Sequence, residues 1–172
     1  MKTLRERLRS ETKEFHDFLE SQYPFNTLLE QKDLAKNTER ALICFKLCFY
    51  SFLNQLKDEH EFYQKSFDSL SKVKPELNDK LLTLKPIKDD LHLHYLFLGS
   101  RMGNKLVINK NPSILEVQGG DYFNIDMPQE LWKDFLTQLD QVQDIEQQNM
   151  IIGQVKMSFK ELAQYGLLLQ ST

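Results

Sequence analysis

His16 is the residue near the start of the chain whose chemistry most needs an explanation. Apolar residues around it follow a spacing that predicts one amphipathic helix over residues 3–22. At 100° per residue, His16 stands at the edge of the apolar stripe, with Arg9 and Lys13 near it and Glu20 one turn further along. A carboxylate in that position can accept the Nδ1–H of the ring and aim Nε2 outward, as carboxylates do beside metal-ligating histidines.

The flank of the helix that carries His16 is rich in cations. In angular order it holds Thr12, Arg5, His16, Arg9, Glu20 and Lys13. A ligand with an apolar body, a metal and anionic groups at its rim suits such a flank, and haem with its propionates meets that description. A single histidine among surface arginines is also common where nothing binds. The first helix alone therefore leaves both interpretations open.

Two glycines lie inside the helix predicted from Pro86 to about residue 108. Gly99 and Gly103 are four residues apart, so they share a face, and each costs a helix interior about 0.5–1 kcal/mol relative to alanine. Such a bare face indicates that something approaches the backbone closely. Either another helix packs there, as in small-xxx-small contacts, or a flat ligand lies against it, with a bend at the glycines giving it room.

The other metal-binding residue types form no second cluster in the sequence. Cys44 and Cys48 share an apolar helix face and are interpreted as buried free thiols. His92 and His94 would share one face of a strand, but on a helix they diverge by about 200°. A di-iron carboxylate site expects two Glu-x-x-His pairs, and only Asp89, three residues before His92, comes near that pattern.

Composition and charge narrow the classes of protein to consider. A chain of 172 residues fits one domain with a substantial core, and six glycines with five prolines are few for the turns of an all-β fold. The net charge of −3 without a basic block argues against nucleic-acid binding. No apolar run reaches the roughly 20 residues that span a bilayer, and the N-terminus lacks the apolar segment of a secretory signal. We therefore expect a cytoplasmic protein without nucleic-acid or membrane partners.

The elements that position these residues are predicted to be helices throughout. Besides the two helices above, helical patterns cover about residues 33–68, which residues 57–60 can interrupt, and residues 74–85, 128–141 and 144–168. The single long loop is predicted at residues 109–126. Nothing separates two domains, so residues 1–172 are predicted to form one all-α domain of six or seven helices.

Four stretches of the sequence resemble the haem oxygenase family, in particular its short bacterial members. LRSETKEFHDFLE (residues 8–20) is similar to the proximal-helix motif, and YLFLGSRMGNKLV (residues 95–107) to the distal glycine-serine-x-x-glycine pattern. GGDYFNIDMPQELWKDFLTQL (residues 119–139) and QVKMSFKELAQY (residues 154–165) resemble later segments of the family. Their order and spacing agree from about residue 4 to residue 165. The resemblance implies a single-domain, multi-helical haem oxygenase-like fold.

The resemblance also implies a role for each candidate residue. His16 would ligate the haem iron through its neutral imidazole, and Glu20 would orient the ring. Gly99, Ser100 and Gly103 would form the catalytic distal face, beside the coordination position left open for molecular oxygen. The remaining haem-binding positions are Thr12, Arg9, Lys13, Met102, Asn104, Lys133 and Phe159, of which Arg9, Lys13 and Lys133 can face the propionates and Phe159 lines the pocket.

The implied reaction is the oxidative cleavage of haem to biliverdin, carbon monoxide and ferrous iron. Haem is then both substrate and cofactor, electrons come from a ferredoxin- or flavoprotein-type donor, and a monomer or weak dimer is expected. Ser100 stands where many members have aspartate, and Asn104 where many have a second glycine. Asn104 can hydrogen-bond toward the distal water or crowd the ring, so turnover is affected more than binding. The alternative is a haem-binding or storage protein of the same fold that leaves haem intact.

Overall fold

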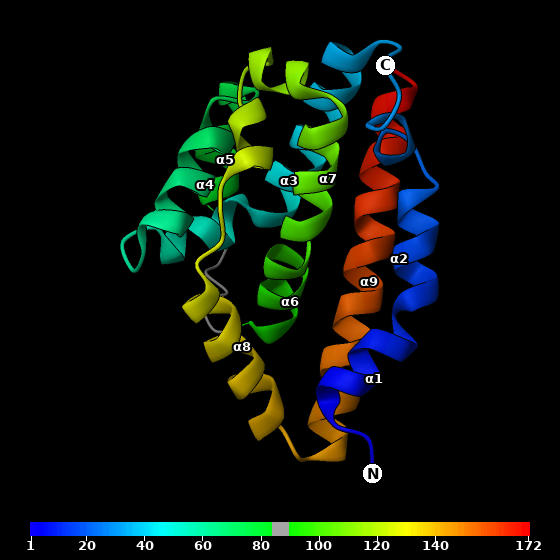
Figure 1. Cartoon of the computed structure of the whole chain (residues 1–172), viewed down its shortest axis with the longest axis vertical. Coiled ribbons are helices and arrows are strands. Elements are labelled where there is room, and N and C mark those ends of the chain that lie inside the picture. Colours follow the sequence, from blue (N-terminus) through cyan, green and yellow to red (C-terminus); the bar gives the residue numbers. More distant parts are fainter. Residues whose placement is uncertain (84–89) are drawn as a thin grey trace.

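The computed structural model describes residues 1–83 and 90–172, and every regular element in these two ranges is a helix (Figure 1). The α-helices are α1 (Leu4–Glu11), α2 (Lys13–Glu20), α3 (Leu34–Leu56), α4 (Glu61–Ser71), α5 (Asn78–Leu82), α6 (Leu91–Gly99), α7 (Arg101–Lys110), α8 (Gln129–Gln141) and α9 (Ile145–Gln170). Short 3₁₀ helices are η1 (Phe25–Thr27), η2 (Pro75–Leu77), η3 (Pro112–Glu116) and η4 (Gly120–Asn124). The prediction of a single all-α domain is confirmed.

Side chains at the helix starts fix where several helices begin. The Thr3 hydroxyl accepts the Glu6 N–H at 3.2 Å and the Glu6 carboxylate accepts the Thr3 N–H at 2.8 Å, a capping box that starts α1. Nδ1 of His60 accepts the Phe62 N–H at 3.0 Å at the start of α4, and Asp144 caps α9 in the same way. Each such cap contributes about 1 kcal/mol to helix stability.

α3 supplies the centre of the hydrophobic core. It packs against α4, α5, α6 and α9, and its buried rings meet aromatic residues from several other elements. Phe49 lies 5.4 Å from Phe97 of α6, and Phe45 lies 5.6 Å from Tyr122 of η4, measured between ring centroids. Burying each large apolar side chain contributes about 1.5–3 kcal/mol. This aromatic core holds α6 and the start of α7 in place.

The first predicted helix is broken at Thr12, which the sequence pattern did not reveal. Thr12 ends α1 and precedes α2 with φ −103° and ψ −3°, and its hydroxyl donates to the Leu8 carbonyl at 2.6 Å. Back-bonding of this kind bends helices. The apolar stripe continues across the break through Leu8 and Leu19, both buried, which is why periodicity alone predicted one helix.

A second break separates α6 from α7 at Ser100, where the glycines predicted a bend. At the C-terminal end of α6, the Ser100 hydroxyl donates its hydrogen to the Phe97 carbonyl at 2.8 Å. The predicted start of this helix at Pro86, the end of the predicted segment at residues 74–85, and Asp89 all lie outside the described residues.

The other predicted boundaries agree with the structure apart from the long loop. α3 ends at Leu56 and α4 begins at Glu61, so the expected interruption is present. The segment predicted as one loop over residues 109–126 instead contains η3 and η4, whose short turns the helical periodicity does not detect. None of the described helices is both long and apolar enough to cross a membrane.

Candidate functional site

His16 lies on α2, at the edge where this helix packs on α9. Its side chain is 52% exposed, and its ring meets the ring of Phe159 edge-on, with 5.6 Å between the centroids. Phe159 itself is buried on α9. The structure thus brings together two predicted haem-binding residues from opposite ends of the chain.

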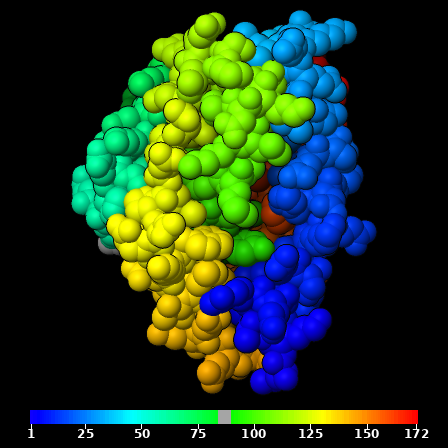
Figure 2. Space-filling view, in the orientation of Figure 1, coloured from blue at the N-terminus to red at the C-terminus, as the bar shows by residue number. Residues whose placement is uncertain are grey.

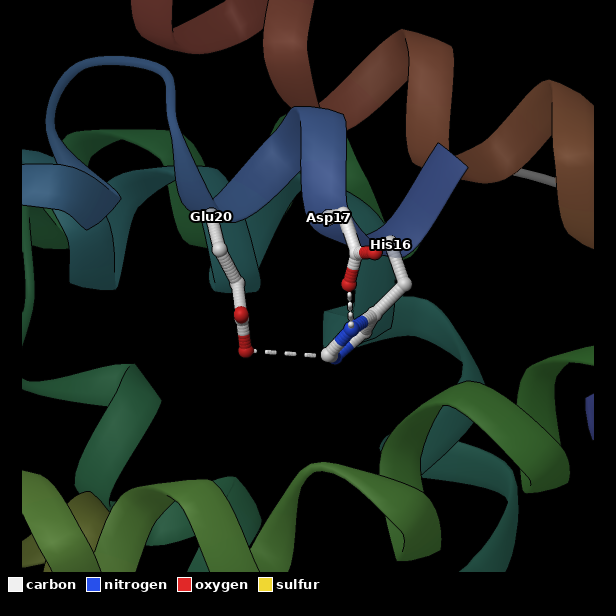
Figure 3. Close-up of side chains that lie close together, drawn as sticks. All are labelled: His16, Asp17 and Glu20. Atoms are coloured by element: carbon white, nitrogen blue, oxygen red, sulfur yellow. Dashed lines mark ion pairs between the residues drawn. The ribbon is translucent and has the colours of Figure 1, made fainter. Parts of the chain in front are cut away.

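Two carboxylates flank the His16 ring, and their arrangement differs from the prediction (Figure 3). Nε2 lies 3.4 Å from Oε1 of Glu20, whereas Nδ1 lies 3.8 Å from Oδ1 of Asp17. Glu20 was predicted at Nδ1, and the structure contradicts that pairing. Nδ1 is the ring nitrogen nearer the backbone, within reach of the next residue, whereas a side chain one turn further on meets the far nitrogen.

The same three side chains form a compact donor set. His16, Asp17 and Glu20 each offer one ligand atom, and these atoms lie within 4.8 Å of one another. All three residues are exposed, and exposed acidic groups are common without any ion. Whether this donor set can take part in binding a metal-containing ligand therefore depends on which elements lie opposite it.

The glycine face of α6 and α7 is open. Gly99 and Gly103 are exposed, and a Cβ added at either position would meet no atom of the described residues within 4 Å. Gly166 of α9 shows the contrast, because a Cβ there would lie 2.1 Å from the carbonyl oxygen of Tyr23. Among the described residues nothing packs on Gly99 or Gly103, so helix–helix packing does not account for them.

A hollow runs between the segment that holds α2 and the segment that holds α6 and α7. Figure 2 shows it between blue and green atoms, with the orange-red atoms of α9 at its base. We call it the furrow and assign to it His16 of α2, the exposed residues Gly99, Met102 and Gly103 of α6 and α7, and Phe159 of α9, whose ring contacts that of His16. α9 packs against both α2 and α6, whereas α2 and α7 have no extensive contact within the described part of the chain. In Figure 3 the side chains of His16 and Glu20 project from α2 toward the green segment.

The open face also carries apolar side chains. Met102 is 80% exposed and Leu106, one turn along α7, is 54% exposed. With the two glycines they form a flat strip of bare backbone and flexible apolar groups. Such a strip suits a planar apolar body better than a globular polar one.

Tyr95 was missed by the sequence reasoning, although it is four residues before Gly99 and so on the same side of α6. Burial raises the pKa of Tyr95, while Thr12 and Arg9 act to lower it, which places both residues near its hydroxyl. Thr12 itself is buried. Tyr95, Thr12 and Arg9 therefore form a polar group where α6 passes the junction of α1 and α2.

The predicted cationic residues differ in whether an ion pair already holds their side chains. Lys13 forms an ion pair with Asp17 at 2.6 Å, and both side chains are exposed. Arg5 is paired with a carboxylate of α8. Arg9 and Lys133 are exposed and form no ion pair with the described part of the chain. Solvent screens exposed ion pairs, so Lys13 can be released from Asp17 at little cost.

The inner side of α7 is buried and holds Asn104. Its side chain points away from the open face, and Nδ2 has no hydrogen-bond partner among the described residues. Beside it, the Arg101 guanidinium lies 4.4 Å from the centroid of the Tyr122 ring and donates to the Tyr122 carbonyl at 3.0 Å. Burial lowers the pKa of Arg101. These contacts anchor the first turn of α7, and Asn104 is not positioned to crowd a ligand in the furrow.

The remaining histidines do not meet as a metal pair. His92 is paired with Asp90 through Nδ1, whereas the His94 ring packs against Phe52 and Phe135, with centroid distances of 4.8 and 6.1 Å. The predicted divergence of His92 and His94 on a helix agrees with their different surroundings on α6.

The two cysteines of α3 are free thiols, as predicted. Cys44 is buried and Cys48 is half-buried. Burial raises the pKa of each thiol to about 12, so both stay protonated at neutral pH. Protonated thiols are poor nucleophiles and poor metal ligands.

Comparison with protein-family models, with curated proteins and with solved structures finds no match to this chain. A functional proposal for it therefore rests on the furrow and on the residues that line it.

Proposed function

We propose that this protein is a haem oxygenase that binds haem in the furrow. The observation that carries the proposal is the pairing of an exposed imidazole, His16, with an uncovered glycine face on α6 and α7. A protein that uses haem as a substrate needs one nitrogen ligand on one side of the ring and open space on the other. The donor types and the shape of the furrow fit those needs.

The side of the furrow formed by α2 would bind the iron. His16 supplies a neutral imidazole nitrogen, with Glu20 3.4 Å from Nε2 and Asp17 3.8 Å from Nδ1. A small side-chain rotation would bring Asp17 within hydrogen-bonding distance of Nδ1. Nε2 can bind the iron once Glu20 turns aside, with Asp17 then holding Nδ1–H. Phe159 packs against the ring of His16 and limits its rotation.

The opposite side of the furrow would leave the second axial position open. Gly99 and Gly103 remove the side chains that would otherwise project into the space, and the break at Ser100 turns the backbone there. The Ser100 hydroxyl is occupied by the Phe97 carbonyl, so it is not placed to act as an acid or base. The helix propensity lost at two glycines is the cost of this open space.

One edge of a haem carries its two propionates, and the furrow has cations that would pair with them. Arg9 has no ion-pair partner in the described chain, and Lys13 is held only by an exposed pair. Tyr95 adds a phenolic hydrogen near Arg9. These residues would fix the rotation of the ring about its axis and therefore which edge is cleaved.

When bound, haem itself supplies the iron that activates oxygen and the macrocycle that is cleaved. The protein binds and orients the ring, excludes bulk water with apolar side chains such as Met102 and Leu106, and needs no acid–base side chain of its own. Electrons would come from a ferredoxin- or flavoprotein-type donor.

The exposed Met102 favours a second candidate, a haem carrier that does not degrade its ligand. Its thioether is 80% exposed beside Gly103, and methionine paired with histidine is a known axial ligand set in electron-transfer haem proteins. A thioether bound to the iron would close the position that oxygen needs. The Met102→Leu variant separates the two candidates, because leucine keeps the apolar bulk and removes the ligand atom.

The test is to add hemin to the purified protein, follow the Soret band, and then supply ascorbate or a ferredoxin system in air. We expect a one-to-one complex whose Soret band is replaced by bilin absorption, with release of carbon monoxide. A stable complex that turns over only in Met102→Leu would favour the carrier. The absence of saturable binding would overturn both candidates.

A further inference from the structure

A cavity of about 300 Å³ lies on the other side of α6 from the furrow. It is enclosed by the end of α3, the start of α4, α6 and α8, with His94 and Leu98 of α6 facing it. Tyr95 follows His94 and Gly99 follows Leu98, and both Tyr95 and Gly99 belong to the furrow side of α6. The cavity is therefore separate from the proposed haem site and needs its own explanation.

The inner walls of this cavity are largely aromatic. Phe135 and Tyr63 are both buried, and the His94 ring stacks on Phe135 at an interplanar angle of 27°. The Tyr63 ring lies 6.5 Å from His94 between centroids. Several ring faces thus meet around one small space, and Leu56 and Leu98 complete its apolar lining.

Tyr63 brings a polar group into this space without a partner. Its side chain is only 5% exposed, it lines the cavity, and its hydroxyl forms no hydrogen bond with the described part of the chain. The Tyr63 oxygen is not itself fully buried, so this hydroxyl is accessible from the cavity. A ligand with a polar group can hydrogen-bond to it in place of water.

The mouth of the cavity is acidic. Glu59, Asp134 and Gln138 line it, and the described residues that line it include no lysine or arginine. Asp134 forms no ion pair with any described residue. His60 accepts the Phe62 N–H through Nδ1, which leaves Nε2 to carry the hydrogen, and Nε2 lies 4.0 Å from Oε1 of Glu130. Among the described residues of the lining, Asp134 therefore supplies a carboxylate that no ion pair holds.

We propose that this cavity, walled by Tyr63, His94 and Phe135 and bordered by Asp134, binds a small organic cation such as a quaternary ammonium or a primary amine. Aromatic faces attract cations through their quadrupoles, most strongly where water is excluded. The carboxylate of Asp134 supplies the opposite charge, and the Tyr63 hydroxyl can accept a hydrogen bond from an amine. Anions and neutral apolar molecules lack at least one of these interactions.

The chain provides its own reporter for the test. Trp132, the one tryptophan in the sequence, lies on α8 with its ring 5.9 Å from that of Phe135, between centroids. The whole protein is titrated with tetramethylammonium chloride while tryptophan fluorescence is followed, with sodium chloride at equal ionic strength as the reference. We expect a saturable change with a dissociation constant on the order of 1 mM, as suits a ligand of few atoms.

Matched variants distinguish the proposed site from general salt effects. Asp134→Asn should weaken binding about fivefold or more, whereas Asp140→Asn, the same charge change on the same helix at a residue paired with Arg5, should leave it unchanged. A response equal to that of sodium chloride would overturn the proposal. So would equal binding of 3,3-dimethyl-1-butanol, a neutral molecule of similar shape, or equal weakening in both variants.

Discussion

The two sides of α6 differ in almost every property that governs ligand binding. The furrow is open, its glycine backbone is bare, and the charged residues near Tyr95 include Arg9, which forms no ion pair with the described residues. The cavity holds about 300 Å³ and is walled by rings and bordered by carboxylates. One side thus suits a flat ligand with anionic groups and the other a compact cation.

This difference arises within a few residues of one helix. His94 and Leu98 face the cavity, whereas Tyr95 and Gly99 belong to the furrow, because consecutive helical residues point about 100° apart. The pattern shows how a short helix can separate two chemically opposite environments. It also means that substitutions on one side should leave the other side largely intact.

The largest effect is expected from comparing the two histidines. His16→Ala should remove nitrogen ligation of haem and weaken haem binding at least about tenfold. Mutating a residue that only hydrogen-bonds to a metal ligand already lowers metal affinity about tenfold, and His16 is the proposed ligand itself. His94→Ala should keep the axial nitrogen signature, because its ring packs against Phe52 and Phe135 instead. Electronic absorption and electron paramagnetic resonance spectra of the hemin complexes are the measurements. Nitrogen ligation that persists in His16→Ala would remove His16 from its proposed role.

A second comparison uses Gly103, which lies on an open helix face, and Gly166, which is closely packed. Gly103→Ala should raise the free energy of unfolding by about 0.5–1 kcal/mol, because a Cβ there has no described atom within 4 Å and alanine is the better helix former. Gly166→Ala should lower it by about 1–3 kcal/mol, because the added Cβ would overlap the Tyr23 carbonyl. Urea unfolding measures both.

The Gly103→Leu variant then distinguishes an effect on folding from an effect on hemin binding. Gly103→Leu should remain folded and bind hemin much more weakly, since its side chain would fill the furrow. Unchanged hemin affinity in a folded Gly103→Leu protein would show that the glycine face is not part of the site.

The last comparison concerns the cavity and the dependence of stability on pH. Burial, and then the charge of Glu59, raise the pKa of Tyr63 from 10.0 to about 12. Between pH 10 and 12 the unfolded phenol loses its proton while the folded one keeps it, so this residue makes stability fall as the pH rises through that window. At pH 11 the contribution is about 1 kcal/mol. Tyr63→Phe should show a correspondingly smaller loss of stability between pH 9 and 11 in urea unfolding, and an equal loss would contradict the shift.

Much of the fold follows from local sequence signals. The capping residues Thr3 and Asp144 and the apolar spacing fix most helix boundaries within a few residues. The break at Thr12 escaped prediction because the apolar stripe crosses it. The turns η3 and η4 escaped because their short hydrogen-bonded loops follow no helical period.

The candidate site was predicted less completely. His16, Gly99 and Gly103 stand out by residue type and spacing, but the sequence does not show that Asp17, rather than Glu20, meets Nδ1. Nor does it show that Asn104 turns inward. Both depend on side-chain directions that spacing alone does not specify.

The sequence by itself determined an all-helical chain with one exposed histidine flank and one bare glycine face. Only the tertiary structure decided that no described residue covers the glycines and that Phe159 reaches His16. It also decided that Tyr63 and Asp134 share a cavity. The physical reason is that caps and apolar periodicity act between near neighbours, whereas the contacts that shape the furrow and the cavity join residues brought together only when the helices pack around the core of α3.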